Sequence, residues 1–167
     1  MDNRRTAPHM TALNGGKRVE KNHSIIAFRG ELDELRALSR VIRSEYMEDG
    51  IVDVCAKVVI DRCNALFTCE YTGQRVSLVP YALIDAPNRM SHDPEKYFGV
   101  SHFFNEDITE PALCKLDLLR TVVRRAERAA AAAFGYARED IVGELNTLSS
   151  YVYCCMCLYR KRMESGQ

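Results

Sequence analysis

The sequence lacks an excess of charge of either sign. Its 167 residues include 23 lysines and arginines and 23 aspartates and glutamates, so the formal net charge at pH 7 is zero. A protein that binds nucleic acid needs a basic patch or stripe, because contacts to the phosphate backbone dominate the affinity. The balanced charge therefore argues against nucleic acid as a partner.

Long hydrophobic runs are also missing. A transmembrane helix needs about 20 consecutive apolar residues, and even the longest apolar stretches, such as residues 129–134, fall far short of that length. The chain does not open with a charged segment followed by an apolar one, which is the pattern of an export signal. The sequence therefore predicts no membrane association and a cytoplasmic location.

Cysteine, in contrast, is frequent. Seven cysteines, an odd number, in a chain without an export signal indicate reduced thiols in a cytosolic protein. Three of them, Cys154, Cys155 and Cys157, fall within one turn of a predicted helix, where their side chains point in divergent directions. No fourth ligand is near in sequence, so we favour core thiols over the alternative of a metal site.

Apolar residues recur with helical spacing over most of the chain, whose length suits one domain. The pattern predicts long helices over residues 30–47, 51–71, from 107–111 to 134, and 138–163, with a short helix over 76–84. The predicted fold class is all-α, an up-and-down helical bundle of four long helices plus a short one.

Residues 1–24 precede this bundle domain, which we assign to residues 25–167. They contain Gly15 and Gly16, several basic residues and little apolar periodicity. We interpret them as an extended or mobile arm, and a disordered tail is the alternative.

The helix predicted to end at residue 134 carries charges beside its apolar stripe. At 3.6 residues per turn, Arg120, Arg124 and Glu127 line up at positions i, i+4 and i+7. A guanidinium at the edge of an apolar surface requires a carboxylate or a phosphate in good geometry, because its desolvation is costly. The row suits an anionic ligand, and a structural ion-pair network between neighbouring helices is the alternative.

The same helix resembles the signature helix of the ATP:cob(I)alamin adenosyltransferases. The shared run is Leu119-Arg120-Thr121-x-x-Arg124-Arg125-Ala126-Glu127-Arg128. Other stretches resemble the family in the expected order: Phe28-Arg29-Gly30-x-Leu32-Asp33-x-Leu35, the segment from Ser91 to Phe104, and Leu145-Asn146-x-Leu148-Ser149. The N-terminal segment and the 91–104 segment resemble the ethanolamine-utilisation type, without the cysteine-rich N-terminal extension of that type.

The resemblance implies transfer of the 5′-deoxyadenosyl group of ATP to cob(I)alamin, with triphosphate as the leaving group. It further implies Mg²⁺ on the phosphates, a homotrimer or homodimer with sites between subunits, and as partners a flavoprotein reductase and a B12-dependent acceptor enzyme. A non-catalytic helical carrier or sensor of cobalamin is the alternative. The Gly-rich triphosphate loop of the propanediol-utilisation type has no recognisable counterpart in residues 1–24.

The motifs also imply roles for single residues at the nucleotide. Arg124, together with Arg125 and Lys21, corresponds to the positions that hold phosphates. Thr11 and Glu127 are further candidates for cofactor contacts. An ordinary solvated lysine is the alternative for Lys21.

A second group of residues corresponds to positions that the family uses to orient its site and to contact the corrin ring. Asp33 would pair with Arg120 and fix the orientation of that arginine. Asn146 would point into the nucleotide and corrin site. An acidic residue that merely suits the first turn of a helix is the alternative for Asp33.

The aromatic-rich segment of residues 91–104 is predicted to be a non-helical loop, and its length invites a functional explanation. The resemblance implies that Phe103 or Phe104 displaces the lower axial ligand of cobalamin. Removal of that ligand brings the cobalt potential within reach of a reductant. His92 and His102 are interpreted as ordinary hydrogen-bonding loop residues.

Overall fold

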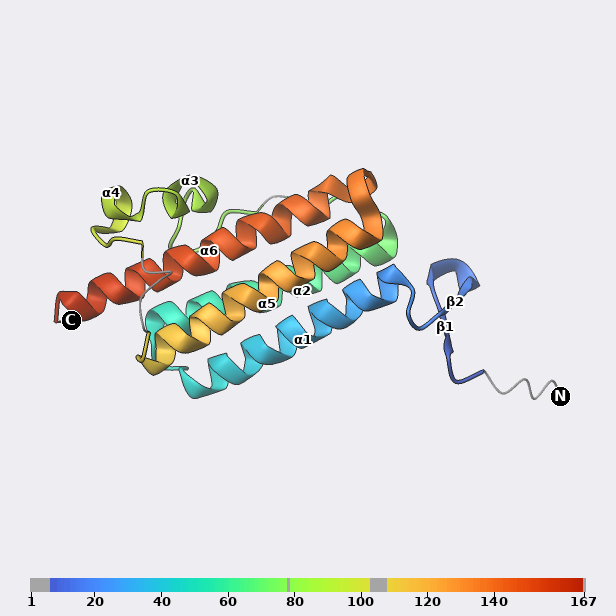
Figure 1. The fold of residues 1–167 in the computed structure, drawn as a ribbon, viewed down its shortest axis with the longest axis horizontal. Coiled ribbons are helices and arrows are strands. Elements are labelled where there is room, and N and C mark those ends of the chain that lie inside the picture. The colour runs from blue at the N-terminus through green and yellow to red at the C-terminus, as the bar shows by residue number, and fades with distance from the viewer. Residues whose placement is uncertain (1–6, 78, 103–107, 167) are drawn as a thin grey trace.

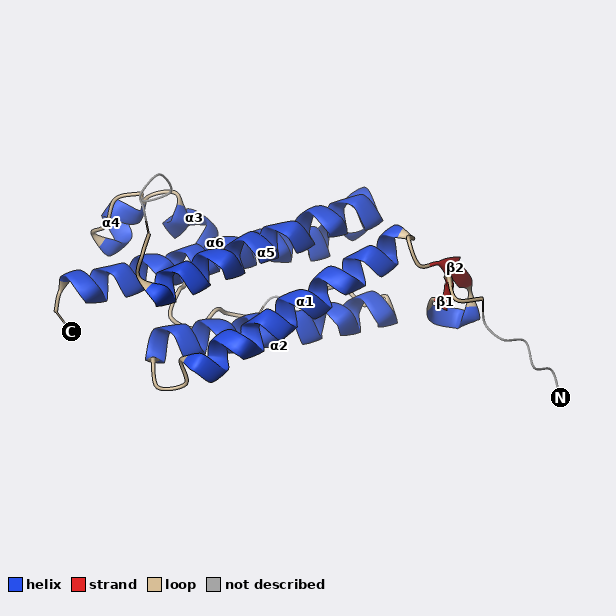
Figure 2. Ribbon diagram, turned by 60° about the horizontal axis from the view of Figure 1, so that its bottom comes forward, coloured by secondary structure: helices blue, strands red, loops and turns tan. Residues whose placement is uncertain are grey.

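Four long helices form the body of the protein in a computed structural model, which describes residues 7–77, 79–102 and 108–166. They are α1 (Ser24–Glu45), α2 (Gly50–Thr72), α5 (Pro111–Phe134) and α6 (Glu139–Glu164). Helix α1 packs against α2 and α5, and α6 packs against the same two helices. Neighbouring helices run antiparallel around one core (Figures 1 and 2). The predicted all-α bundle is confirmed, and none of the described helices has the length and apolar character to cross a membrane.

Helices α2 and α5 run in the same direction, so the chain between them returns along the bundle (Figure 1). This connection carries two short helices, α3 (Pro87–Ser91) and α4 (Pro94–Phe98), both packed against α6. Each begins at a proline, whose missing N–H costs nothing in a first turn. Two predictions were therefore wrong: α4 interrupts the supposed loop over 91–104, and the described residues of the 76–84 stretch form no helix.

Side chains hold that stretch in an extended form. The guanidinium of Arg62 on α2 donates to the carbonyls of Val79 and Pro80, and lies 4.3 Å from the ring centroid of Tyr81. The Tyr81 hydroxyl donates to Glu144 Oε1 on α6 at 2.7 Å, and Arg62 Nε lies 3.3 Å from the same oxygen. These contacts use carbonyls that a helix would use internally, and Pro80 has no N–H to offer a helix.

Capping residues set the helix ends. Glu110 accepts a hydrogen bond from the backbone N–H of Leu113 at 2.7 Å, so α5 begins at Pro111 and, as predicted, ends at Phe134. Asp107, the first residue of the predicted capping box, lies outside the described residues.

Helix α1 starts earlier than predicted, at Ser24 instead of Gly30. The His23 side chain accepts from the N–H of Ile25 at 3.2 Å, and the buried Phe28 ring meets Phe134 edge-on at 5.1 Å. Burial of a large aromatic side chain contributes more than the roughly 1 kcal/mol that a glycine costs inside a helix.

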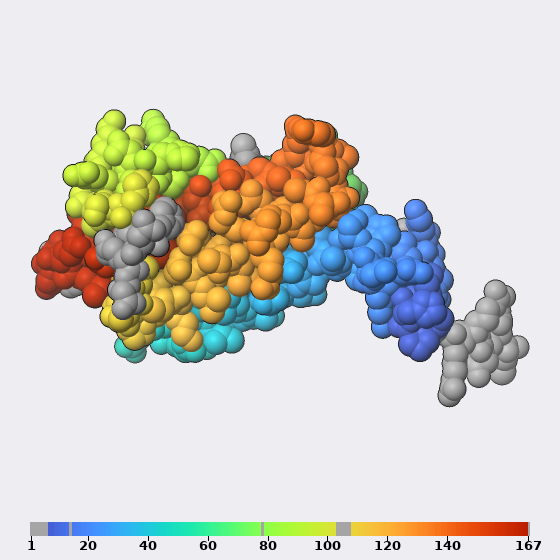
Figure 3. Space-filling view, in the orientation of Figure 1, coloured from blue at the N-terminus to red at the C-terminus, as the bar shows by residue number. Residues whose placement is uncertain are grey.

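The N-terminal segment forms a small antiparallel hairpin of β1 (Met10–Ala12) and β2 (Arg18–Glu20), with Thr11 opposite Val19. Gly15 and Gly16 in the short 3₁₀ turn η1 (Asn14–Gly16) have positive φ angles, which glycine adopts without a steric penalty. The hairpin projects from the end of the bundle where α1 begins, and α3 and α4 lie toward the other end (Figures 1 and 3).

Five of the seven cysteines are buried in the core: Cys55, Cys63, Cys154, Cys155 and Cys157. Burial raises the pKa of the Cys63 and Cys157 thiols to about 12. Such thiols stay protonated and pack as small apolar side chains. Their burial supports the core-thiol interpretation of the cysteines on α6, and no group of three or more potential metal ligands occurs within the described ranges.

We therefore expect a thiol reagent to distinguish the cysteines of the native protein. Cys114 is exposed and should react first, and the partly buried Cys69 should follow more slowly. The five core thiols should react only after unfolding, because the thiolate is the nucleophile. Mass spectrometry of the native and the denatured protein after labelling would test this, and rapid native labelling of Cys154, Cys155 or Cys157 would contradict it.

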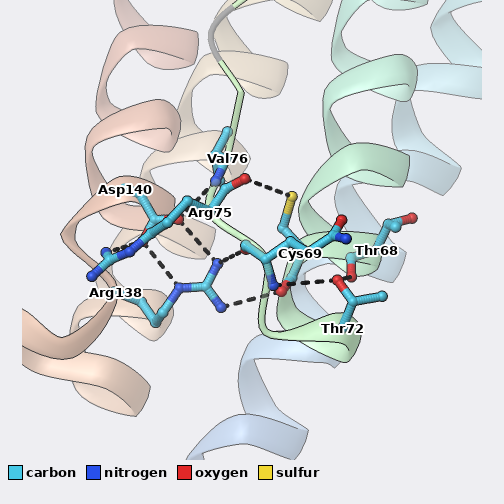
Figure 4. A network of polar contacts seen from close by, with 8 residues as sticks. Thr68, Cys69, Thr72, Arg75, Val76, Arg138 and Asp140 are labelled. Carbon is cyan, nitrogen blue, oxygen red and sulfur yellow. Dashed lines mark hydrogen bonds and ion pairs between the residues drawn. The ribbon is translucent and has the colours of Figure 1, made fainter.

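The turn between α5 and α6 is fastened to the end of α2 (Figure 4). Arg138 donates to Asp140 at 3.0 Å and to the carbonyl of Cys69 at 3.2 Å. Asp140 also accepts from Arg75 Nη1 and from the backbone N–H of Val76, both at 2.9 Å. These charge-assisted hydrogen bonds, that from Arg138 above all, hold the pKa of Asp140 well below its ordinary value.

We expect Asp140→Asn to lower the free energy of unfolding at pH 7 by about 2 kcal/mol, because it removes a charge with several hydrogen-bond partners. The carboxyl has a lower pKa in the folded than in the unfolded state. Its contribution is therefore complete above the ordinary pKa of 3.8 and is lost as the pH falls further, toward the folded-state pKa. Denaturant unfolding of the wild type and of Asp140→Asn at several pH values should show that the difference between their free energies of unfolding becomes smaller in acid. A difference independent of pH would contradict this account.

Candidate functional site

A cleft of about 230 Å³ lies between the α3–α4 connection and the helices α5 and α6. Its lining residues are polar or cationic almost throughout: Ser91, His92, His102, Arg120, Arg124, Ser149, Ser150 and Tyr153. The connection stands above α6 at one end of the bundle, as the space-filling view shows (Figure 3). The cleft thus joins residues from two rigid helices with residues from the connection.

Polar and apolar contacts hold α3 against α6. Asn88 Nδ2 donates to Thr147 Oγ1 at 2.9 Å, and the Cys154 thiol donates to the Pro87 carbonyl at 3.6 Å. Pro87 itself is buried. Together they place Ser91, at the end of α3, and the residue after it over the cleft.

The two predicted arginines of α5 both line the cleft, but their surroundings differ. Arg120 is held by Asp117 one turn earlier, with Nε and Nη2 at 2.9 and 2.8 Å from Oδ1, and its side chain is 19% exposed. Arg124 is 49% exposed, and its only partner among the described residues is Glu127, at 3.7 Å. Arg124 is therefore the cation in the cleft with the weakest pairing.

A histidine and a tyrosine form another part of the wall. His102 Nδ1 lies 2.9 Å from the hydroxyl oxygen of Tyr153, and the two rings stack with centroids 5.9 Å apart and planes 17° apart. Tyr153 is 3% exposed, and burial raises the pKa of its phenol, which therefore stays protonated. His92 and His102, which were predicted to be hydrogen-bonding loop residues, both line the cleft.

Asp33 and Arg120 do not meet within one chain. Asp33 pairs with Arg36 at 2.6 Å, and Arg36 also donates to Asn64 on α2 at 3.2 Å. Asp33 thus lies on the side of α1 near α2, whereas Arg120 faces the cleft.

Arg125 points away from the cleft, toward α1. Its guanidinium forms ion pairs with Glu31 and Glu34, and these carboxylates raise the pKa of Arg125. Glu31 and Glu34 thus neutralise Arg125 within one subunit. Glu127 lies beside Arg124, and its buried Oε2 has no hydrogen-bond partner among the described residues.

The remaining predicted residues lie at different distances from the cleft. Asn146 is exposed and shares a face of α6 with Ser150 and Tyr153, at positions i, i+4 and i+7. Thr11 and Lys21 belong to the hairpin segment, at the far end of the bundle (Figure 1). Phe103 and Phe104 lie outside the described residues.

Sequence reasoning missed Ser91, Ser150 and Tyr153. Ser150 carried a weak signal as a polar residue at the edge of an apolar stretch, and Ser91 opens the segment that resembles the family. Tyr153 carried no signal for a functional site, since an aromatic residue inside an apolar helix is typical of the core. Arginine, histidine and serine side chains gathered in one cleft supply the hydrogen-bond donors that phosphate oxygens accept.

Comparison with known proteins decides the family. The family model described as cobalamin adenosyltransferase matches residues 4–159 of the chain. The chain belongs to the cobalamin adenosyltransferase family. The resemblance drawn from the helix motifs is thereby confirmed.

Among the relatives of this family member are the proteins named corrinoid adenosyltransferase EutT from Salmonella typhimurium and Escherichia coli K12. Each is 32% identical over 158 residues, which cover 89% of this chain and 58% of the relative. The chain therefore spans less than two thirds of the length of these relatives.

Proposed function

We propose that this chain transfers the 5′-deoxyadenosyl group of ATP to cob(I)alamin, giving adenosylcobalamin and triphosphate. Membership of the cobalamin adenosyltransferase family supports the proposal, as does similarity to proteins named corrinoid adenosyltransferase. The structural observation that carries it is Arg124, a half-exposed guanidinium in a cleft, with one weak carboxylate contact.

The reaction does not require the protein to supply a general base, because cob(I)alamin is itself the nucleophile. The cobalt of cob(I)alamin attacks C5′ of ATP with its electron pair, the cobalt–carbon bond forms, and the bond from C5′ to the triphosphate oxygen breaks. The protein must align the two substrates and stabilise the charge on the departing triphosphate. Arg124 contacts that charge, and Arg120, fixed by Asp117, supports it. Mg²⁺ bound with ATP would neutralise part of the charge on the triphosphate.

On this proposal Asn146 contacts the substrates, and Phe103 or Phe104, which follow the cleft residue His102 directly, occupies the lower face of cobalt. The reaction takes place in the cytoplasm, where a flavoprotein reductase supplies cob(I)alamin and a B12-dependent enzyme accepts the product.

The site is completed by a second subunit of a homodimer or homotrimer. The hairpin with Thr11 and Lys21 lies at the other end of the bundle from α3 and α4 (Figure 1). Asp33 likewise faces away from Arg120 in its own chain. In the proposed assembly, the arm and α1 of one subunit approach the cleft of its neighbour, where Lys21 meets phosphate as a point charge.

Arg124→Ala should lower kcat/KM by about 10²-fold or more, because it removes a donor to the charge that develops on the leaving group. The assay incubates the protein with ATP, Mg²⁺ and chemically reduced cobalamin and follows the corrin spectrum. Lys57→Ala, at an exposed position of α2 outside the proposed contact, is the matched control and should keep wild-type turnover. Near-wild-type turnover of Arg124→Ala would remove the phosphate assignment.

The same assay separates the enzyme from a carrier. Growth of the adenosylcobalamin spectrum that depends on ATP supports the proposal. Tight corrin binding without ATP-dependent conversion would identify a cobalamin carrier or sensor instead.

Mixing of variants tests the shared site. Lys21→Ala and Arg124→Ala chains should each be weakly active alone. Co-expressed in equal amounts, they should recover about a quarter of wild-type activity, because about that share of sites combines an intact arm with an intact cleft in a symmetric assembly. Activity of the mixture no higher than the mean of the two variants would show that arm and cleft do not combine between subunits.

A further inference from the structure

The proposed function gives no role to the pair formed by His102 and Tyr153. We propose that Tyr153 is a positioning residue that fixes the His102 imidazole as a third nitrogen donor, beside Arg120 and Arg124, for the phosphate oxygens of the triphosphate. The inference rests on the proposed function and adds a specific contact to its site.

The geometry of the pair supports fixation of the imidazole. His102 is exposed and lies in the connection, whereas Tyr153 is 3% exposed and sits on α6, within the bundle. The contact of 2.9 Å and the near-parallel rings limit both torsions of the histidine side chain. A side chain ordered before the ligand arrives does not lose that freedom on binding, so it binds more tightly.

The contact between Tyr153 and Nδ1 leaves Nε2 as the nitrogen that donates to the ligand when the phenol donates to Nδ1. A neutral imidazole that accepts at Nδ1 carries its proton on Nε2. The Tyr153 phenol is able to donate to Nδ1, because burial keeps it protonated. When the imidazole is protonated, Nε2 still carries a hydrogen. His102 therefore offers a donor at Nε2 in both states.

The surroundings favour an anionic ligand for this donor. None of the described residues lining the cleft is acidic, and Arg120, Arg124 and His92 share the cleft with His102. The carboxylates nearest to the arginines, Asp117 and Glu127, pair with them along α5. Guanidinium, imidazole and serine hydroxyl groups together match the oxygens of a phosphate chain.

The test is a double-mutant cycle on the binding of inorganic triphosphate with Mg²⁺ to the full chain, measured by calorimetry. His102→Ala should weaken binding about 10-fold, as expected for loss of a hydrogen bond to a charged group. Tyr153→Phe keeps the ring packing and should weaken binding about 3-fold, because the imidazole is no longer held. In the His102→Ala background, Tyr153→Phe should have no further effect, since it acts through the histidine.

His92→Ala is the matched control, since it removes the other imidazole of the same cleft, for which the structure shows no contact with Tyr153. In that background Tyr153→Phe should still weaken binding. Equal effects of Tyr153→Phe with and without His102 would overturn the inference. Unchanged triphosphate binding by His102→Ala would also overturn it, as would a His102→Ala variant that changes only the binding of cobalamin. Thermal unfolding of each variant confirms that its fold is retained.

Arg124→Ala in the same titration distinguishes failure of the histidine contact from failure of the phosphate site. If Arg124→Ala loses triphosphate binding and His102→Ala does not, the proposed function stands and the histidine contact fails. If Arg124→Ala binds triphosphate like the wild type, the phosphate site itself fails.

Discussion

The buried ion pair between Arg62 and Glu144 determines the path of the chain between α2 and α5. Both side chains are almost fully buried, so removal of either would leave the other charge without compensation in the core. The same guanidinium donates hydrogen bonds to the carbonyls of Val79 and Pro80, and the carboxylate accepts one from the hydroxyl of Tyr81. The connection therefore follows the groove between α2 and α6 and delivers α3 over α6, where the cleft forms. The position of the site depends on this contact, although the pair itself lies outside the cleft.

The helices were predictable because their apolar stripes and caps are local features of the sequence. The row of Arg120 and Arg124 was predictable for the same reason, since helical spacing alone places both on one face beside the core. The partner of each charge was not, because it depends on which neighbouring helix the face meets. Arg125 follows Arg124 directly in the sequence, yet it faces the two glutamates of α1.

The connection was the least predictable part of the fold, because long-range side-chain contacts fix it in place of internal hydrogen bonds. Its apolar residues suggested a helix over 76–84 that the contacts of Arg62 prevent. The two histidines of the cleft were undervalued because a loop histidine carries no periodic signal, and only the tertiary structure brings Tyr153 to His102. The lining of the cleft thus combines residues that are distant in sequence.

The hairpin contributes little to the interior of the bundle. Val19 is its one buried apolar residue among those described, and it does not belong to the hydrophobic core cluster. Insertions, deletions and substitutions in this segment therefore leave the folding of the helices untouched. The sequence of this segment is thus able to change without a change in the packing of the helices. A chain without a recognisable Gly-rich loop can in this way keep the same helical body.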